Sequence, residues 1–190
     1  MIRSTLTLAA LAVALAAPGN AAASGGNYRF DGGTAKQQGQ VRSALNASSF
    51  DWNVVPTQIT IHIGRGSDSE AAYGEIWLDA DLLNSGVFSW GTVQHEYAHQ
   101  VDFFLFSDVQ RGALALGIGG SSWWAPGVGI TQHGNLSSER FASTLAWSYW
   151  QSSKNSMKPR SKTDESAAMA PAAFKSLLGS VLAGGATQAA

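Results

Sequence analysis

The segment 90–106 constrains the fold more than any other part of the chain, because its apolar spacing predicts one long helix. Apolar side chains recur there every three or four residues, as they do along one face of a helix. They are Val93, Tyr97, Val101, Phe104 and Leu105. We therefore expect an amphipathic helix that buries this stripe in the core.

The same predicted helix carries the motif HEYAH at residues 95–99. Residues four apart share a helix face, so His95 and His99 direct their imidazoles at one point. Glu96 follows the first histidine, where its carboxylate reaches a metal-bound water without becoming a ligand. The motif predicts that one zinc ion is bound by His95 and His99, with Glu96 as general base.

A zinc ion with two protein nitrogens needs a third protein ligand and keeps its fourth position for water. Glu139, on a separate predicted helix, is the first candidate. Asp102 stands one turn beyond His99 and fits better as a structural acid or as support for a ligand. His133, in the loop before Glu139, is the third. No glycine follows His99 where a metzincin helix turns, which disfavours that group.

The rest of the chain predicts an α+β fold. Strands are expected at residues 58–63 and 73–79, paired in one sheet, and further helices at 34–47, 135–149 and 171–182. Residues 112–129 are rich in glycine and predict a long loop with a helical piece at its start, whereas 154–166 predict an exposed excursion. We expect a small mixed sheet packed against the helix at 90–106, with a helical C-terminal half.

Residues 1–23 predict a signal peptide. Arg3 precedes an apolar run at 6–17, and residues 18–23 (PGNAAA) supply the small side chains that a signal peptidase needs. The run is shorter than the ~20 apolar residues that span a bilayer, so no stable membrane anchor is expected. The protein is accordingly expected to be secreted, outside the cell or into the cell envelope.

Residues 24–190 suffice for one compact core, so we expect a single catalytic domain, monomeric, with 24–33 and 183–190 disordered. Without Arg3, the 12 basic residues become 11 against 13 acidic ones, a net charge of −2. The basic stripe of a nucleic-acid-binding protein is missing. The chain has no cysteine, which excludes a cysteine zinc site and a cysteine nucleophile.

The motif at 95–99 together with residues 139–142 (ERFA) resembles the gluzincin group of zinc metallopeptidases, especially its small single-domain members. The matching motifs lie chiefly within residues 73–150. The resemblance implies a zincin-like domain in which His95, His99 and Glu139 bind zinc and Glu96 is the base. It also implies that the strand at 74–79 lies along the cleft and pairs with the substrate backbone.

The sequence departs from the thermolysin-like pattern in two ways. The spacing between the ligands is longer, since Glu139 follows His99 by 139 − 99 = 40 residues. Ser143 also stands four residues after Glu139, where an acidic residue would support the ligands. Both departures concern the strength of metal binding.

Peptide hydrolysis also needs a hydrogen-bond donor for the negative oxygen of the tetrahedral intermediate. His133 and Tyr149 are the candidates, and the loop position of His133 favours it. Three roles stay open for Trp123 and Trp124: they line a substrate pocket, they bind the face of a sugar, or they only anchor their loop.

The function expected from these residues is a secreted zinc endopeptidase that acts on peptides or proteins. Two alternatives stay open. One is a zinc hydrolase that trims cell-wall peptides with the same ligands. The other is a non-catalytic secreted module that binds a polysaccharide or a protein through the aromatic loop, without zinc.

Overall fold

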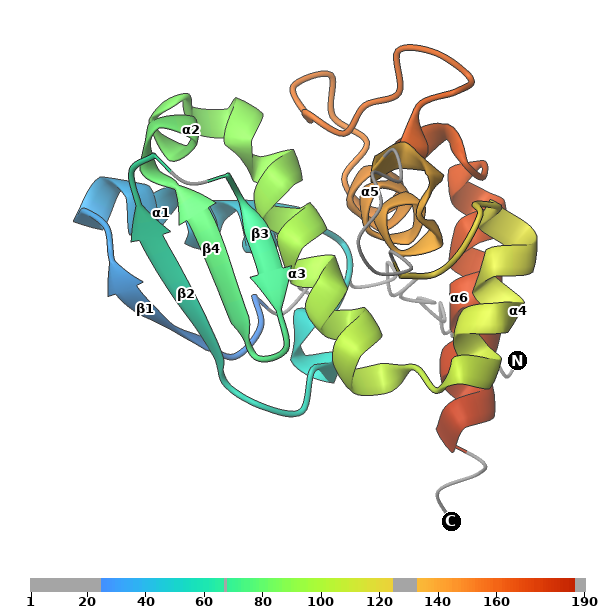
Figure 1. Cartoon of the computed structure of the whole chain (residues 1–190). Coiled ribbons are helices and arrows are strands. Elements are labelled where there is room, and N and C mark those ends of the chain that lie inside the picture. The colour runs from blue at the N-terminus through green and yellow to red at the C-terminus, as the bar shows by residue number, and fades with distance from the viewer. Residues whose placement is uncertain (1–24, 67, 125–132, 187–190) are drawn as a thin grey trace, which may run out of the picture.

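The computed structural model describes residues 25–66, 68–124 and 133–186. Within them the chain is a mixed α+β fold, with a four-stranded sheet beside a bundle of helices (Figure 1). The strands are β1 (Tyr28–Gly32), β2 (Ile59–Gly64), β3 (Glu70–Ala72) and β4 (Glu75–Asp79). The helices are α1 (Ala35–Ala47), α2 (Ala80–Asn84), α3 (Trp90–Leu105), α4 (Asp108–Ile118), α5 (Ser137–Tyr149) and α6 (Pro171–Ala186). The predicted α+β class with a small mixed sheet is confirmed.

The sheet has the strand order β1-β2-β4-β3. Strands β1, β2 and β4 are parallel to one another, and β3 runs antiparallel to β4 at the edge. The predicted pairing of 58–63 with 73–79 is confirmed by the contact of β2 with β4. However, β4 has a neighbour on each side, so the expectation that 74–79 pairs with a substrate is wrong. The edge position belongs to β3, which the sequence pattern did not reveal.

The prediction that residues 24–33 are disordered is wrong. Strand β1 lies there and pairs with β2 from Tyr28 to Gly32. The Tyr28 ring packs edge-on against Phe30 at 5.3 Å and against Tyr97 at 6.4 Å, which gives β1 an apolar anchor. The glycine and serine residues before Tyr28 led to the prediction of disorder, but the aromatic residues of the strand that follows pack against the core.

The C-terminal helix extends further than predicted. Helix α6 continues to Ala186, so residues 183–186 are helical and not disordered as predicted. Residues 1–23 and 187–190 lie outside the described part of the chain. No helix in the described part is long and apolar enough to cross a membrane.

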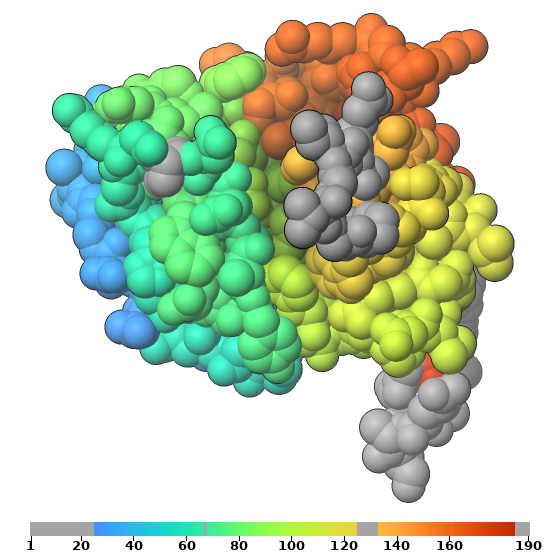
Figure 2. Space-filling model, in the orientation of Figure 1, coloured from blue at the N-terminus to red at the C-terminus, as the bar shows by residue number. Residues whose placement is uncertain are grey.

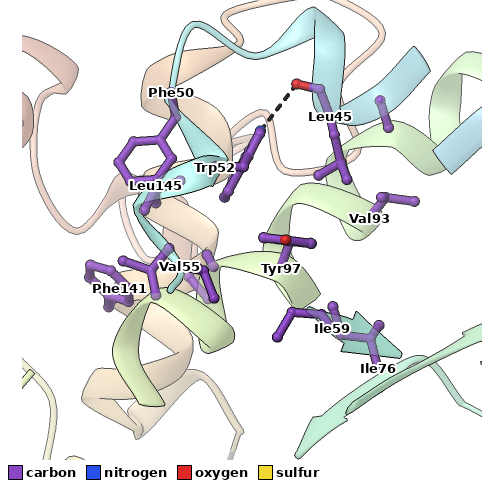
Figure 3. Close-up of a cluster of buried hydrophobic side chains, with 14 of the residues drawn as sticks. Leu45, Phe50, Trp52, Val55, Ile59, Ile76, Val93, Tyr97, Phe141 and Leu145 are labelled. Atoms are coloured by element: carbon purple, nitrogen blue, oxygen red, sulfur yellow. Dashed lines mark hydrogen bonds between the residues drawn. The ribbon is translucent and has the colours of Figure 1, made fainter. Parts of the chain in front are cut away.

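Helix α3 is fixed in place by an aromatic core between the sheet and α5 (Figure 3). The buried Trp52 ring meets Tyr97 of α3 at 5.3 Å and Phe50 at 4.9 Å, both edge to face. Its indole N–H donates to the Leu45 carbonyl of α1 at 3.1 Å. Tyr97 lies between His95 and His99 in the sequence and is fully buried in this core. The two histidines therefore lie on the opposite face of α3, which is left for polar residues.

The segment predicted as a loop at 112–129 is helical in its first part. Helix α4 begins after Ser107, whose side chain forms a capping box with Gln110, and continues to Ile118. Leu114 and Ile118 are buried, and α4 lies beside α6 (Figure 1). Glycine disfavours a helix in isolation, and tertiary packing stabilises this one. Residues 125–132 are outside the described part.

The turn between β3 and β4 is clamped to α3 by the side chain of Gln100. Its Oε1 accepts from the Gly74 N–H at 2.9 Å, and its Nε2 donates to the carbonyls of Ala72 at 2.8 Å and Glu75 at 3.0 Å. Gly74 has φ +81°, a conformation that glycine adopts without strain. The clamp holds the edge strand β3 alongside α3.

Replacing Gln100 by Met is expected to lower the free energy of unfolding by about 1–3 kcal/mol, because it leaves three backbone groups of the turn without their partner. Urea unfolding followed by circular dichroism measures the change. The same substitution at the exposed Gln151 is the control and is expected to stay within about 0.5 kcal/mol. Equal stability of both variants would show that the clamp contributes nothing.

Candidate metal centre

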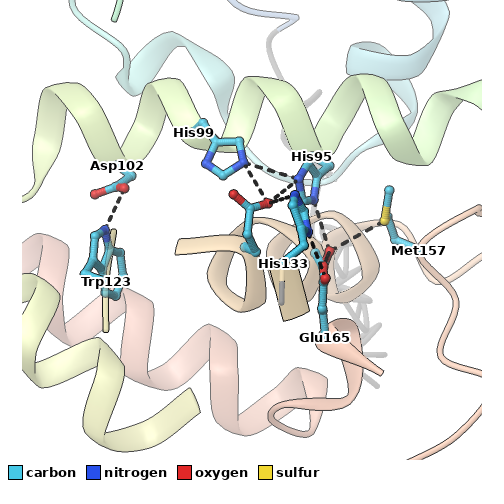
Figure 4. A network of polar contacts seen from close by, with 9 residues as sticks. His95, His99, Asp102, Trp123, His133, Met157 and Glu165 are labelled. Carbon is cyan, nitrogen blue, oxygen red and sulfur yellow. Dashed lines mark hydrogen bonds and ion pairs between the residues drawn. The ribbon is translucent and has the colours of Figure 1, made fainter. Parts of the chain in front are cut away.

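Helices α3 and α5 bring together the three residues predicted as zinc ligands (Figure 4). Nε2 of His95 lies 3.2 Å from Nε2 of His99 and 3.2 Å from Oε2 of Glu139. The third distance, from His99 Nε2 to the same Oε2, is 3.4 Å. The two histidine side chains are nearly buried. Three ligand atoms thus form a nearly equilateral triangle inside the protein.

The size of this triangle fits a small tetrahedral cation. Four ligands at the zinc–nitrogen and zinc–oxygen distances of about 2.0–2.1 Å are separated from one another by about 3.3–3.4 Å. The observed separations of 3.2, 3.2 and 3.4 Å agree with that edge length. A set of two imidazoles and one carboxylate is also the donor set of catalytic zinc sites.

The hydrogen bonds behind His95 fix which of its nitrogens is free. The Ser143 hydroxyl donates its only hydrogen to Glu165 Oε2 at 3.0 Å, so its oxygen accepts from His95 Nδ1–H at 3.0 Å. A neutral His95 then points the lone pair of Nε2 at Glu139 and His99. One proton could bridge a single pair of these atoms, whereas one cation satisfies all three at once.

Glu139 is the anionic member of the triangle. It lies in the first turn of α5, where the helix dipole favours a negative charge. Burial opposes its ionisation, but the hydrogen bond with His133 and, when those rings carry a proton on Nε2, the hydrogen bonds with His95 and His99 outweigh burial and hold the pKa of Glu139 far below its ordinary value. The carboxylate is therefore charged and able to bind a cation.

His133 is held between two carboxylates, in the short helical turn η3 (His133–Asn135). Its Nε2 lies 3.0 Å from Glu139 Oε2 and its Nδ1 lies 3.0 Å from Glu165 Oε1. These two hydrogen bonds raise the pKa of His133 to about 10. The ring is therefore protonated, and both of its N–H groups are engaged by carboxylates beside the candidate metal centre.

Glu96 lies next to the triangle without belonging to it. Its carboxylate and the two histidine nitrogens lie within 4.8 Å of one another. Burial raises the pKa of Glu96, although the neighbouring histidines oppose the change. Among the described residues, no hydrogen bond engages this carboxylate. It is therefore free to accept a proton from a water molecule in the cavity.

Tyr149, the other predicted oxyanion donor, is not part of the centre. Its ring packs edge-on against Phe50 at 5.0 Å, and Lys175 Nζ lies 4.7 Å above it. Ten residues along α5 carry Tyr149 nearly three turns away from Glu139, toward the aromatic core. The prediction of Tyr149 as a donor is wrong for this reason.

Asp102 is also outside the centre, because other groups occupy both of its oxygens. Arg111 Nε donates to Oδ1 and the Trp123 indole donates to Oδ2, each at 2.8 Å. The carboxylate is fully buried and serves as a structural acid, one of the two roles expected for it. Trp123 therefore anchors its loop, whereas its neighbour Trp124 is free for another role.

Glu165 is the residue of the centre that the sequence did not reveal. It lies where the segment 154–166, predicted as exposed, meets the 3-10 turn η4 (Glu165–Ala167). One oxygen holds His133 and the other holds Ser143, which in turn holds His95. Ser143 thus links His95 to the carboxylate of Glu165. The thermolysin-like pattern would place such an acidic residue at position 143 itself. No motif links Glu165 to the other residues, since only packing brings η4 against α5.

The centre forms one wall of a cavity of about 280 Å³. Ser69 and the β3 residues Glu70 and Ala71 contribute to its lining, as do Phe103 and Trp124. Figure 2 shows the surface hollowed between the half that carries the strands and the C-terminal helical half. Metal ligands, a free carboxylate and an edge strand therefore face the same space.

Replacing Glu165 by Gln is expected to weaken zinc binding about 10–100-fold, the usual effect of losing a group that orients a ligand. An amide has one acceptor oxygen and cannot accept from both His133 and Ser143. The dissociation constant is measured by competition with a chromophoric chelator. Glu75→Gln, on the outer face of the sheet, is the control and should leave the constant unchanged. Unaltered zinc affinity of Glu165→Gln would contradict the assigned role.

The chain matches no protein-family model, no curated protein and no solved structure. The atoms and distances of the centre itself therefore carry its chemistry.

Proposed function

We propose that the protein is a zinc-dependent endopeptidase of the zincin type, exported by a signal peptide at 1–23 and carried by a single domain at 24–190. One observation carries the proposal. Three acceptor atoms, from His95, His99 and Glu139, converge at zinc-like separations on the wall of a cavity that also exposes the Glu96 carboxylate. A buried cluster of this kind is satisfied by a cation, and the free carboxylate beside it supplies a base.

The roles of the side chains follow from their positions. Zinc in a site with two histidines and one carboxylate polarises a carbonyl and lowers the pKa of a water molecule toward about 7. Glu96 would accept a proton from a water molecule in the cavity and pass it to the leaving amine. His133 lines the same cavity, and its Nε2–H, which contacts Glu139 in this structure, would turn from that carboxylate to the negative oxygen of the tetrahedral intermediate.

Strand β3 supports a peptide as the substrate. It is the edge strand of the sheet, and the side away from β4 has no strand partner among the described residues. An extended peptide pairs with such an edge through its backbone, and side-chain pockets then give specificity. Since Glu70 and Ala71 line the cavity together with Glu96, a peptide along β3 passes the proposed catalytic centre.

Glu96→Gln is expected to lower kcat about 10²–10⁴-fold while one equivalent of zinc stays bound, since the base is lost and the ligands remain. Glu139→Ala is expected to lose zinc as well as activity. Zinc is measured by elemental analysis and activity with casein or a peptide library. A wild-type protein without zinc, unaffected by Glu96→Gln, would overturn the proposal and favour a non-catalytic binding module.

His133→Asn is expected to lower kcat about 10²–10³-fold with zinc retained, because a donor to the negative oxygen is removed. Tyr149→Phe is the matched control and is expected to keep full activity. Loss of zinc in His133→Asn would instead make His133 a ligand. Steady-state kinetics and zinc content of the two variants distinguish these outcomes.

A further inference from the structure

Phe103 and Trp124 line one end of the cavity, and Tyr73 and Phe104 continue their ring contacts beyond it. We call these four residues the aromatic cluster. Centroid to centroid, the Tyr73 ring lies 4.2 Å from Phe104 and 6.3 Å from Phe103. The Phe103 ring stacks on Trp124 at 5.4 Å, with 13° between the planes. Phe103 also lies 6.3 Å from His99. The cluster therefore extends from the metal centre to the surface.

The cluster is unusually exposed for aromatic residues in mutual contact. Tyr73 is 67% exposed and Trp124 is 41% exposed, although both have aromatic neighbours that could have buried them. Leu116 and Val109 of α4 are more exposed still, but neither of them lines the cavity. Contiguous exposed apolar side chains at a cavity indicate a binding site, whereas scattered ones are common.

Trp124 is held in place by the buried ion pair behind it. The Arg111 guanidinium lies 5.5 Å from the centre of the Trp124 ring, and Arg111 is bound to Asp102. Trp123, bound to the same carboxylate, anchors the preceding residue. Because the indole is already positioned, binding a ligand to it costs little conformational entropy.

The edge strand determines which part of a peptide meets the cluster. Figure 1 shows β3 and α3 running in the same direction, with the Gln100 clamp tying Ala72 to α3. Tyr73, which follows β3, therefore lies at the Phe104 end of α3. A peptide paired antiparallel to β3, the commoner arrangement, has its N-terminal part at this end.

We propose that the aromatic cluster is a specificity subsite for an aromatic or large aliphatic side chain on the N-terminal side of the scissile bond. The proposal rests on the proposed peptidase function and names its substrate class. A peptide fits better than a saccharide, because the cluster continues the cavity along β3, where backbone pairing is available. A large apolar side chain covers the exposed rings and excludes water from them.

The test compares matched peptides that differ only in Phe or Ala at the two residues before the scissile bond. The full chain first cleaves a peptide library, and mass spectrometry locates the cleavage sites. The kcat/KM for the Phe peptide is expected to exceed that for the Ala peptide about 10–100-fold. Trp124→Ala and Tyr73→Ser should each lower this ratio severalfold with zinc content unchanged, whereas the control Leu116→Ser should not.

The outcomes separate this inference from the proposed function. Cleavage of both peptides at equal kcat/KM overturns the subsite but leaves the peptidase intact. A ratio that stays unchanged in both Trp124→Ala and Tyr73→Ser also overturns it, as does a preference only for residues after the scissile bond. If the zinc-loaded protein cleaves no peptide at all, the proposed function fails and this inference fails with it.

Discussion

The contact between α3 and α5 is the constraint on which the rest of the structure depends. It brings the carboxylate of Glu139 within 3.4 Å of two imidazole nitrogens in a nearly buried position. Such a concentration of lone pairs is unfavourable without a shared positive charge. The aromatic core around Trp52 and Tyr97 stabilises the arrangement from behind, because it fixes the rotation of α3 about its axis.

A network of polar residues extends the same constraint to the short turns η3 and η4. Glu165 of η4 holds His133 directly and His95 through Ser143. One carboxylate thereby orients both a predicted ligand and the predicted donor, and it links segments that have no regular secondary structure to the bundle. The candidate metal centre on two helices is thus supported by a residue of the short 3-10 turn η4.

The other side of the cavity is bounded by two sets of polar contacts. The clamp by Gln100 fixes the edge strand β3 beside α3, and the buried Asp102 fixes Trp123 and Arg111. Neither device belongs to the metal centre. Together they leave a free strand edge and a set of exposed rings next to it, which is the combination that an extended peptide with large side chains requires.

The sequence by itself determined the features that depend on local spacing. The periodicity at 90–106 and at 135–149 predicted α3 and α5, and four-residue spacing placed His95 and His99 on one face. Residues 28–32 and 70–72 escaped prediction and α4 was expected only as a helical piece after residue 112, because a short strand or a glycine-containing helix is stabilised by neighbours that are distant in sequence. Helical spacing along α5 already carried Tyr149 away from the centre. Only tertiary packing brought Glu165 to it, since no local period links η4 to the predicted ligands.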